Sequence, residues 1–196
     1  MRCILAVLAA ALLAGCGDSE KARLANPNTS YIPSTGGGEA QPGDDSISYW
    51  DGDGVPGPPS VVIYLKEQRA YFYKGDQLVG VSQVSAGREG HNTPIGNYKI
   101  IQKDPDHASN LYGDYVDASG NVVQKDVELG KDPKPPGAIF KGAPMPFFMR
   151  ITGGVGMHKG YLPGYPASHG CIRMPGKMAE SFFNNVEVGT PVQIAD

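Results

Sequence analysis

Cysteine, tryptophan and clustered charge are all scarce in this sequence. The 196 residues include 3 Cys and 1 Trp, and no run of like charge is longer than Asp44–Asp45. The 17 Lys+Arg nearly balance the 20 Asp+Glu, so the chain lacks the basic surface that nucleic acids require. We therefore expect no nucleic-acid partner.

The sequence also lacks internal repeats and long helical patterns. It has 27 Gly and 17 Pro, too many for a helical bundle, and this content favours short strands joined by turns. The length suits one domain or at most two small ones. We expect a mainly β fold of mixed strands with one or two short helices.

The amino terminus has the layout of an export signal. One basic residue, Arg2, precedes an apolar run from Cys3 to Ala14, which is too short to span a bilayer as a mature helix. Leu13-Ala14-Gly15-Cys16 resembles a bacterial lipobox, in which the signal is removed and the cysteine is lipidated. We expect residues 1–15 to be a signal peptide and Cys16 to carry the lipid; an ordinary secretory signal cut near Gly15 is the alternative.

Cleavage before Cys16 leaves Cys171 as the single free thiol, so no internal disulfide can form. Exported domains usually pair their cysteines because the compartment is oxidising. An unpaired Cys171 therefore needs a separate explanation.

Residues 16–57 read as a flexible, acidic tether rich in Gly, Pro and Ser, because they offer too little apolar surface to offset the entropy of ordering. Tyr49-Trp50 is the exception within it. This aromatic pair either docks on the folded part or stays exposed in the linker.

Residues 58–196 read as one folded domain. Strands are predicted over 61–65, 70–73, 78–84, 98–101, 147–151, the segment leading to His158, and 192–194, with one helix over 175–185. Residues 102–146 read as a long, loop-rich insertion with a hairpin around 117–121. Loops of that length are often functional.

The stretch from Gly156 to Pro175 concentrates the reactive side chains. A thiol attacks an acyl carbon as the thiolate, and a nearby imidazole is the usual means of lowering its pKa. His158 lies thirteen positions before Cys171 and can return to it across a Pro/Gly loop. Gly170 lets a carbonyl approach the thiol, and neighbouring backbone N–H groups can stabilise an oxyanion.

Ser168-His169-Gly170-Cys171-Ile172-Arg173, with an upstream Gly156-Met157-His158, resembles the signature of the YkuD family of L,D-transpeptidases. Supporting similarities are Val84-Ser85-Ala86-Gly87, then Thr93-Pro94-Ile95-Gly96-Asn97-Tyr98, and the terminal Val188-Gly189-Thr190-Pro191-Val192. The resemblance covers about residues 60–194. It implies a YkuD-like catalytic domain over 58–196 that needs no cofactor and binds no metal.

The resemblance also implies roles. Cys171 is the expected nucleophile and His158 the expected base, with its tautomer fixed by a backbone carbonyl at Lys159. The thiol attacks the carbonyl of the third residue of a peptidoglycan stem peptide and releases the terminal D-alanine. An amine from another stem then completes a third-position crosslink, or a lipoprotein is the acceptor.

Several assignments stay open. His169 is a supporting residue whose backbone helps to form the oxyanion pocket, or a competing base. Arg173 either binds a substrate carboxylate or forms a structural ion pair. Ser168 either bonds within its own turn or donates to substrate. Zinc binding by His158, His169 and Cys171, with His91 or His107 as a fourth ligand, is disfavoured because no C-x-x-C or H-E-x-x-H pattern is present.

Two other functions fit the same residues. Water as acceptor would give a peptidoglycan hydrolase, and an unreactive Cys171 would leave a non-catalytic wall-binding lipoprotein. In every case we expect an exported protein attached to a bacterial membrane through lipidated Cys16, at the inner face of the outer membrane if the host has two membranes.

Overall fold

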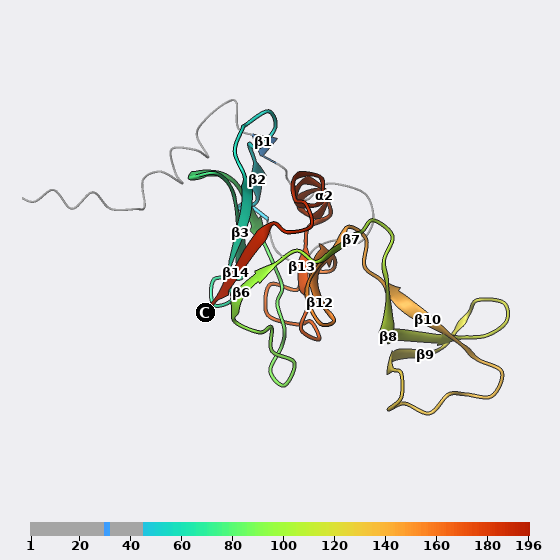
Figure 1. Cartoon of the computed structure of the whole chain (residues 1–196). Helices are drawn as coiled ribbons and strands as arrows, with labels where there is room; N and C mark the ends of the chain where they lie inside the picture. The colour runs from blue at the N-terminus through green and yellow to red at the C-terminus, as the bar shows by residue number, and fades with distance from the viewer. Residues whose placement is uncertain (1–29, 32–44) are drawn as a thin grey trace, which may run out of the picture.

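The structure is a computed structural model that describes residues 30–31 and 45–196. The predicted signal peptide, Cys16 and most of the predicted tether lie outside these residues. The described part is mainly β, as expected, with three sheets and one helix (Figure 1). None of its helices is both long and apolar enough to cross a membrane.

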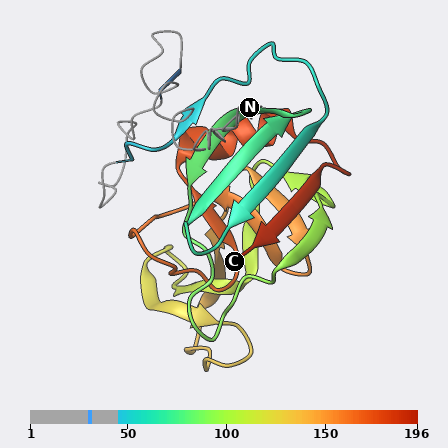
Figure 2. The ribbon, with the colours of Figure 1, turned by 90° about the vertical axis from the view of Figure 1, so that its left-hand side faces the viewer.

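The largest sheet has seven strands in the order β1-β2-β5-β4-β3-β14-β6 and forms the broad face seen in Figure 2. The strands β3, β4 and β5 form the antiparallel meander that the sequence predicts, and β14 joins β3 in parallel. In this order the strand bounds are Ser30–Tyr31, Tyr49–Trp50, Gln77–Gln83, Arg69–Lys74, Pro59–Tyr64, Pro191–Ala195 and Gly96–Lys99.

A second sheet of four strands, in the order β13-β12-β11-β7, carries the predicted reactive residues. Its strands are Ile172–Met174, Val155–Lys159, Phe148–Thr152 and Gln102–Asp104. The helix α2, Gly176–Asn185, follows β13 directly and buries Met178, Ala179 and Phe182. Pro175 is its N-cap, so the helix begins one position after the start at Pro175 that the sequence suggested.

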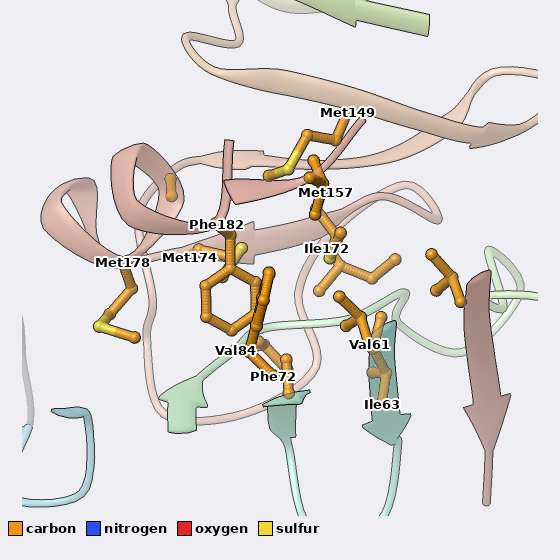
Figure 3. Packing of buried hydrophobic residues seen from close by; sticks show 14 of the residues in the cluster. Val61, Ile63, Phe72, Val84, Met149, Met157, Ile172, Met174, Met178 and Phe182 are labelled. Atoms are coloured by element: carbon orange, nitrogen blue, oxygen red, sulfur yellow. The ribbon is translucent and has the colours of Figure 1, made fainter. Parts of the chain in front are cut away.

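The hydrophobic core fills the space between the large sheet, α2 and the four-stranded sheet. Figure 3 shows Val61 and Phe72 of the large sheet facing Phe182 and Ile172 from the other side. Alternation in β3 explains this arrangement, because Val61 and Ile63 are buried while Tyr64 is exposed. The four-stranded sheet is therefore anchored on one face and leaves the other face for chemistry.

Residues 45–57 belong to the folded part, although composition assigned them to the tether. The strand β2 pairs with β5, and Trp50 is only 3% exposed. Its ring contacts those of Phe72 and Phe182, with centroids 5.1 and 6.0 Å away, and its Nε1 donates to Asp53 Oδ1 at 2.8 Å. The docked alternative for Tyr49-Trp50 is thus the one that the structure adopts.

Residues 102–146 are also more ordered than a loop-rich insertion. They contain β7 and a three-stranded sheet in the order β10-β8-β9, with bounds Ile139–Pro144, Ala108–Val116 and Val122–Glu128. This sheet projects from the main body (Figure 1), and we call it the lobe. The predicted hairpin turn is present, with the Asp117 N–H donating to Asn121 O at 2.9 Å.

Candidate active site

Two parallel strands place His158 and Cys171 on one face of the four-stranded sheet. The register pairs Met157 with Ile172 and His158 with Arg173, so the next pair toward the amino ends is Gly156 with Cys171. Because side chains alternate along a strand, Met157 and Ile172 enter the core while His158 and Cys171 point away from it. His158 and Cys171 are thus diagonal neighbours on this face.

His158 is buried and has a fixed tautomer. Its Nδ1 lies 2.7 Å from the carbonyl O of Lys159 and therefore carries the proton, as the family resemblance implied. This leaves Nε2 unprotonated. Desolvation by burial lowers the pKa of His158 to about 4, although its bond to the Lys159 carbonyl acts in the opposite direction, and the positive charge of Arg173 lowers it further. At neutral pH the ring is an uncharged base.

Cys171 is a neutral thiol in this environment. Its Sγ donates to the carbonyl O of Gly154 at 3.4 Å, and burial raises its pKa despite the Gly156 N–H and the charges of Arg173 and Arg150, which act the other way. The expectation of a thiolate made by a neighbouring imidazole is therefore not met at rest. The thiol must lose its proton during the attack.

Ser168 braces the turn that presents the thiol. It is 1% exposed, its Oγ donates to the carbonyl O of Cys171 at 2.5 Å, and it accepts the N–H of Gly170 at 3.0 Å. The hydroxyl is thus used within the turn, and of the two predicted alternatives the structure supports the local one. Since the Gly170 N–H is occupied, it does not serve as an oxyanion donor in this conformation.

Gly170 has a φ of +113°, in the region that favours glycine, which explains why this residue precedes the thiol. Its carbonyl O accepts the hydroxyl of Thr93 at 2.8 Å, and Thr93 is itself buried. The sequence placed Thr93 within a family pattern but gave it no role. Its position before Pro94 predicts an extended backbone at Thr93 but not these hydrogen bonds.

His169 is exposed, and its ring contacts Arg88 and the lobe. Arg88 Nη2 donates to its Nε2 at 2.8 Å, and the ring of Tyr112 in the lobe stacks on it with centroids 4.1 Å apart. Desolvation and the charge of Arg88 lower the pKa of His169. These contacts join the turn to the lobe through His169, and the sequence analysis assigns no role to Arg88 or Tyr112.

Arg173 lies beside His158 and is partly buried. Burial lowers its pKa, and the nearby Cys171 acts in the opposite direction. No ion pair within the described residues involves Arg173, so the alternative of a structural ion pair finds no support there. A half-buried guanidinium that has no carboxylate partner in the described part of the chain is suited to an anionic ligand.

The described residues hold no group of three or more His, Cys, Asp or Glu side chains placed to bind a metal ion. His107, considered above as a zinc ligand, instead contacts Asp104 Oδ2 through Nδ1 at 3.1 Å and stacks on Phe148. His91 packs edge-on against His169, with centroids 4.8 Å apart.

The chain is similar to several named proteins. YbiS of Escherichia coli K12, named as a probable L,D-transpeptidase, is 30% identical over 144 residues, which cover 69% of this chain and 44% of YbiS. YqjB of Bacillus subtilis, also named as an L,D-transpeptidase, is 28% identical over 143 residues, covering 72% of this chain and 74% of YqjB. The chain thus matches less than half the length of YbiS. A solved L,D-transpeptidase from Mycobacterium smegmatis has the same fold, with a TM-score of 0.54 and 18% identity over 71% of this chain and 59% of that one.

The family described as the L,D-transpeptidase catalytic domain, YkuD, matches residues 58–194. This range contains the four-stranded sheet, the lobe and all of the predicted catalytic and substrate-binding residues. The chain belongs to the YkuD family of L,D-transpeptidase catalytic domains.

Proposed function

We propose that this protein is an L,D-transpeptidase that acts on peptidoglycan stem peptides through a thioester on Cys171. The observation that carries the proposal is the shared face of β12 and the chain entering β13, on which Cys171 and His158 occupy diagonal positions above a packed core. Family membership supports the reaction class, and the site supports the roles of the individual groups.

The first half-reaction forms the acyl-enzyme. His158 Nε2 takes the thiol proton as the sulfur attacks the carbonyl carbon of the third stem residue, and the carbonyl oxygen becomes an oxyanion. When this intermediate collapses, the bond to the terminal D-alanine breaks, and its amine leaves with the proton from the imidazolium. The thioester to Cys171 and free D-alanine are the products.

The second half-reaction transfers the acyl group. An acceptor amine attacks the thioester carbonyl, gives a proton to His158, and forms the new amide as the thiol is restored. An amine of another stem gives a third-position crosslink, and an amine of a lipoprotein gives an attached protein. The low pKa of His158 suits both halves, since the ring accepts a proton only transiently.

Arg173 is proposed to bind a substrate carboxylate near the scissile bond. Its guanidinium lies on the same face as His158, and no described carboxylate neutralises it. A planar guanidinium binds a carboxylate with two parallel hydrogen bonds. Stem peptides carry such groups, so an anionic substrate fits this charge.

The direct test uses purified protein and tetrapeptide-bearing peptidoglycan fragments, with products identified by mass. Loss of one D-alanine and joining of two stems is the expected result. Loss of D-alanine with a free tripeptide would favour water as the acceptor and a hydrolase. No change in the presence of folded protein would favour a wall-binding protein without catalysis. The matched control is Cys171→Ala, which keeps the turn but has no sulfur.

We also propose that the domain is exported and attached to a membrane through a lipid on Cys16, with residues between Cys16 and β2 as the link. The support is Leu13-Ala14-Gly15-Cys16 after a short apolar run. Labelling of cells with an alkyne fatty acid should mark the wild-type protein and leave Cys16→Ser unmarked. Labelling of both forms would contradict this attachment site.

A further inference from the structure

The hydroxyl of Thr93 joins two backbone groups that are far apart in the sequence. It accepts the N–H of Gly87 at 2.9 Å and donates to the carbonyl O of Gly170 at 2.8 Å. Thr93 is only 4% exposed, so these bonds are shielded from water. Residues 87–93 are thereby fastened to the turn that carries Cys171.

The bond to Gly170 also fixes the direction of the next N–H. A trans peptide is planar, and its C=O and N–H point in opposite directions. Because Thr93 binds the Gly170 carbonyl from one side, the Cys171 N–H must point to the other side, away from Thr93. Within the described part of the chain, no group accepts this N–H.

We propose that Thr93 is the positioning residue that orients the oxyanion-binding N–H of Cys171. This inference rests on the proposed acyl transfer and adds a residue to it. The nucleophile's own N–H is a common oxyanion donor, since it is close to the attacked carbonyl. Here the Gly170 N–H is occupied by Ser168, whereas the N–H of the next peptide, that of Cys171, stays available as a donor beside the thiol.

The surrounding backbone makes Thr93 a rigid support. A Cβ at Gly87 would lie 2.1 Å from His91 O and 2.7 Å from Thr93 N, so only glycine allows this tight return of the chain. Pro94 favours an extended conformation at Thr93, and β-branching limits the rotamers of its side chain. Without the hydroxyl, the flexible Gly170 peptide is free to rotate and to turn the Cys171 N–H away.

The test separates oxyanion stabilisation from thiol exposure. Acylation by imipenem passes through an oxyanion, whereas alkylation of the same thiol by iodoacetamide does not. In Thr93→Val, which keeps the shape and removes the hydroxyl, the acylation rate should fall about 10- to 100-fold. The alkylation rate should stay within about twofold, because no oxyanion forms. Thr93→Ser should retain most of the acylation rate because its hydroxyl can make both bonds.

The matched control is Thr190→Val. Thr190 is also buried, also precedes a proline and also accepts a backbone N–H, that of Glu187 at 2.9 Å, but it lies just before β14. The Thr190→Val variant should lose stability as Thr93→Val does, but its rates of acylation and alkylation should equal those of wild type. If Thr93→Val does not fold, Thr93→Ala, measured in the cold, makes the same comparison against Thr93→Ser.

Two outcomes would overturn the inference while the proposed function stands: equal falls in acylation and alkylation, or no fall in either. Equal falls would mean that Thr93 only maintains the turn. Wild-type protein that is alkylated on Cys171 but is never acylated would overturn the proposed function itself, and this inference with it.

Discussion

Acid should destabilise this fold through His158 in particular. The ring has a pKa of about 4 in the folded protein against 6.5 when unperturbed, because burial disfavours its charged form. The unfolded chain therefore binds the proton more tightly, and stability is lost as pH falls from about 6.5 toward 4. One pKa unit corresponds to about 1.4 kcal/mol, so this group removes about 3 kcal/mol between about pH 7.5 and pH 4.

The measurement is urea unfolding of wild type and of His158→Asn at a series of pH values. Asparagine can donate to the Lys159 carbonyl as Nδ1 does, but it does not titrate. The free-energy difference between the two proteins should shrink by about 3 kcal/mol from about pH 7.5 to pH 4, since only wild type is penalised by acid.

Cys171→Ala is the control for this experiment. A thiol does not titrate in the acid range, so this variant should follow the pH dependence of wild type. A constant difference between wild type and His158→Asn at all pH values would refute the reasoning, because it would mean that His158 is solvated in the folded protein.

Other features of the structure make further predictions. The rate of Cys171 acylation by imipenem should vary by less than about threefold between about pH 5.5 and 8.5, because His158 is already unprotonated and the thiol pKa is raised; a bell-shaped profile centred near neutrality would indicate an ion pair instead. Gly170→Ala should lower stability by about 1–3 kcal/mol, measured by thermal unfolding, since φ is +113° there; an unchanged midpoint would contradict this. Trp50→Ala should cost about 3–5 kcal/mol in urea, and a cost below about 1 kcal/mol would mean that β2 is not part of the core. Tyr112→Ala should speed hydrogen exchange in residues 168–171 without unfolding the main sheet, and unchanged exchange would argue against the contact with the lobe.

Much of the main body can be predicted from the sequence, because the hydrophobic pattern within each strand or helix indicates its type and its buried side. The alternation in β3 and the apolar side of α2 can be seen without knowledge of the partners. The lobe cannot be predicted in this way, because its small core consists of Tyr115, Val127, Ala138 and the flanking Phe140, and most other residues of its strands are polar or exposed. Short polar strands that are separated by prolines and glycines have the same composition as loops.

The burial of Trp50 cannot be predicted from the sequence for a different reason. Composition over residues 16–57 is that of a linker, and the partners that bury the indole, Phe72 and Phe182, are 22 and 132 positions away in the sequence. Only the tertiary arrangement brings them together. The strand β2 therefore extends the large sheet beyond the family match, which begins at residue 58.

The residues of the site also fall into two groups, those that the sequence singles out and those that only the structure reveals. The sequence around Cys171 and His158 is distinctive enough to single out both residues, and the structure puts them on one face. Thr93 and Arg88 act through contacts with the turn that depend on how residues 85–93 cross it, and no local pattern reveals these contacts. The protonation state of the thiol cannot be predicted from the sequence either, because it depends on how deeply the turn buries the sulfur.

The most direct test of a Cys171 nucleophile with a His158 base is the intact mass of the protein after exposure to imipenem. Wild type should gain the mass of one imipenem, and peptide mapping should place it on Cys171. Cys171→Ala should gain none, and His158→Asn should react at least about 100-fold more slowly. Folded wild-type protein that gains no mass, or that gains it at another residue, would contradict the account.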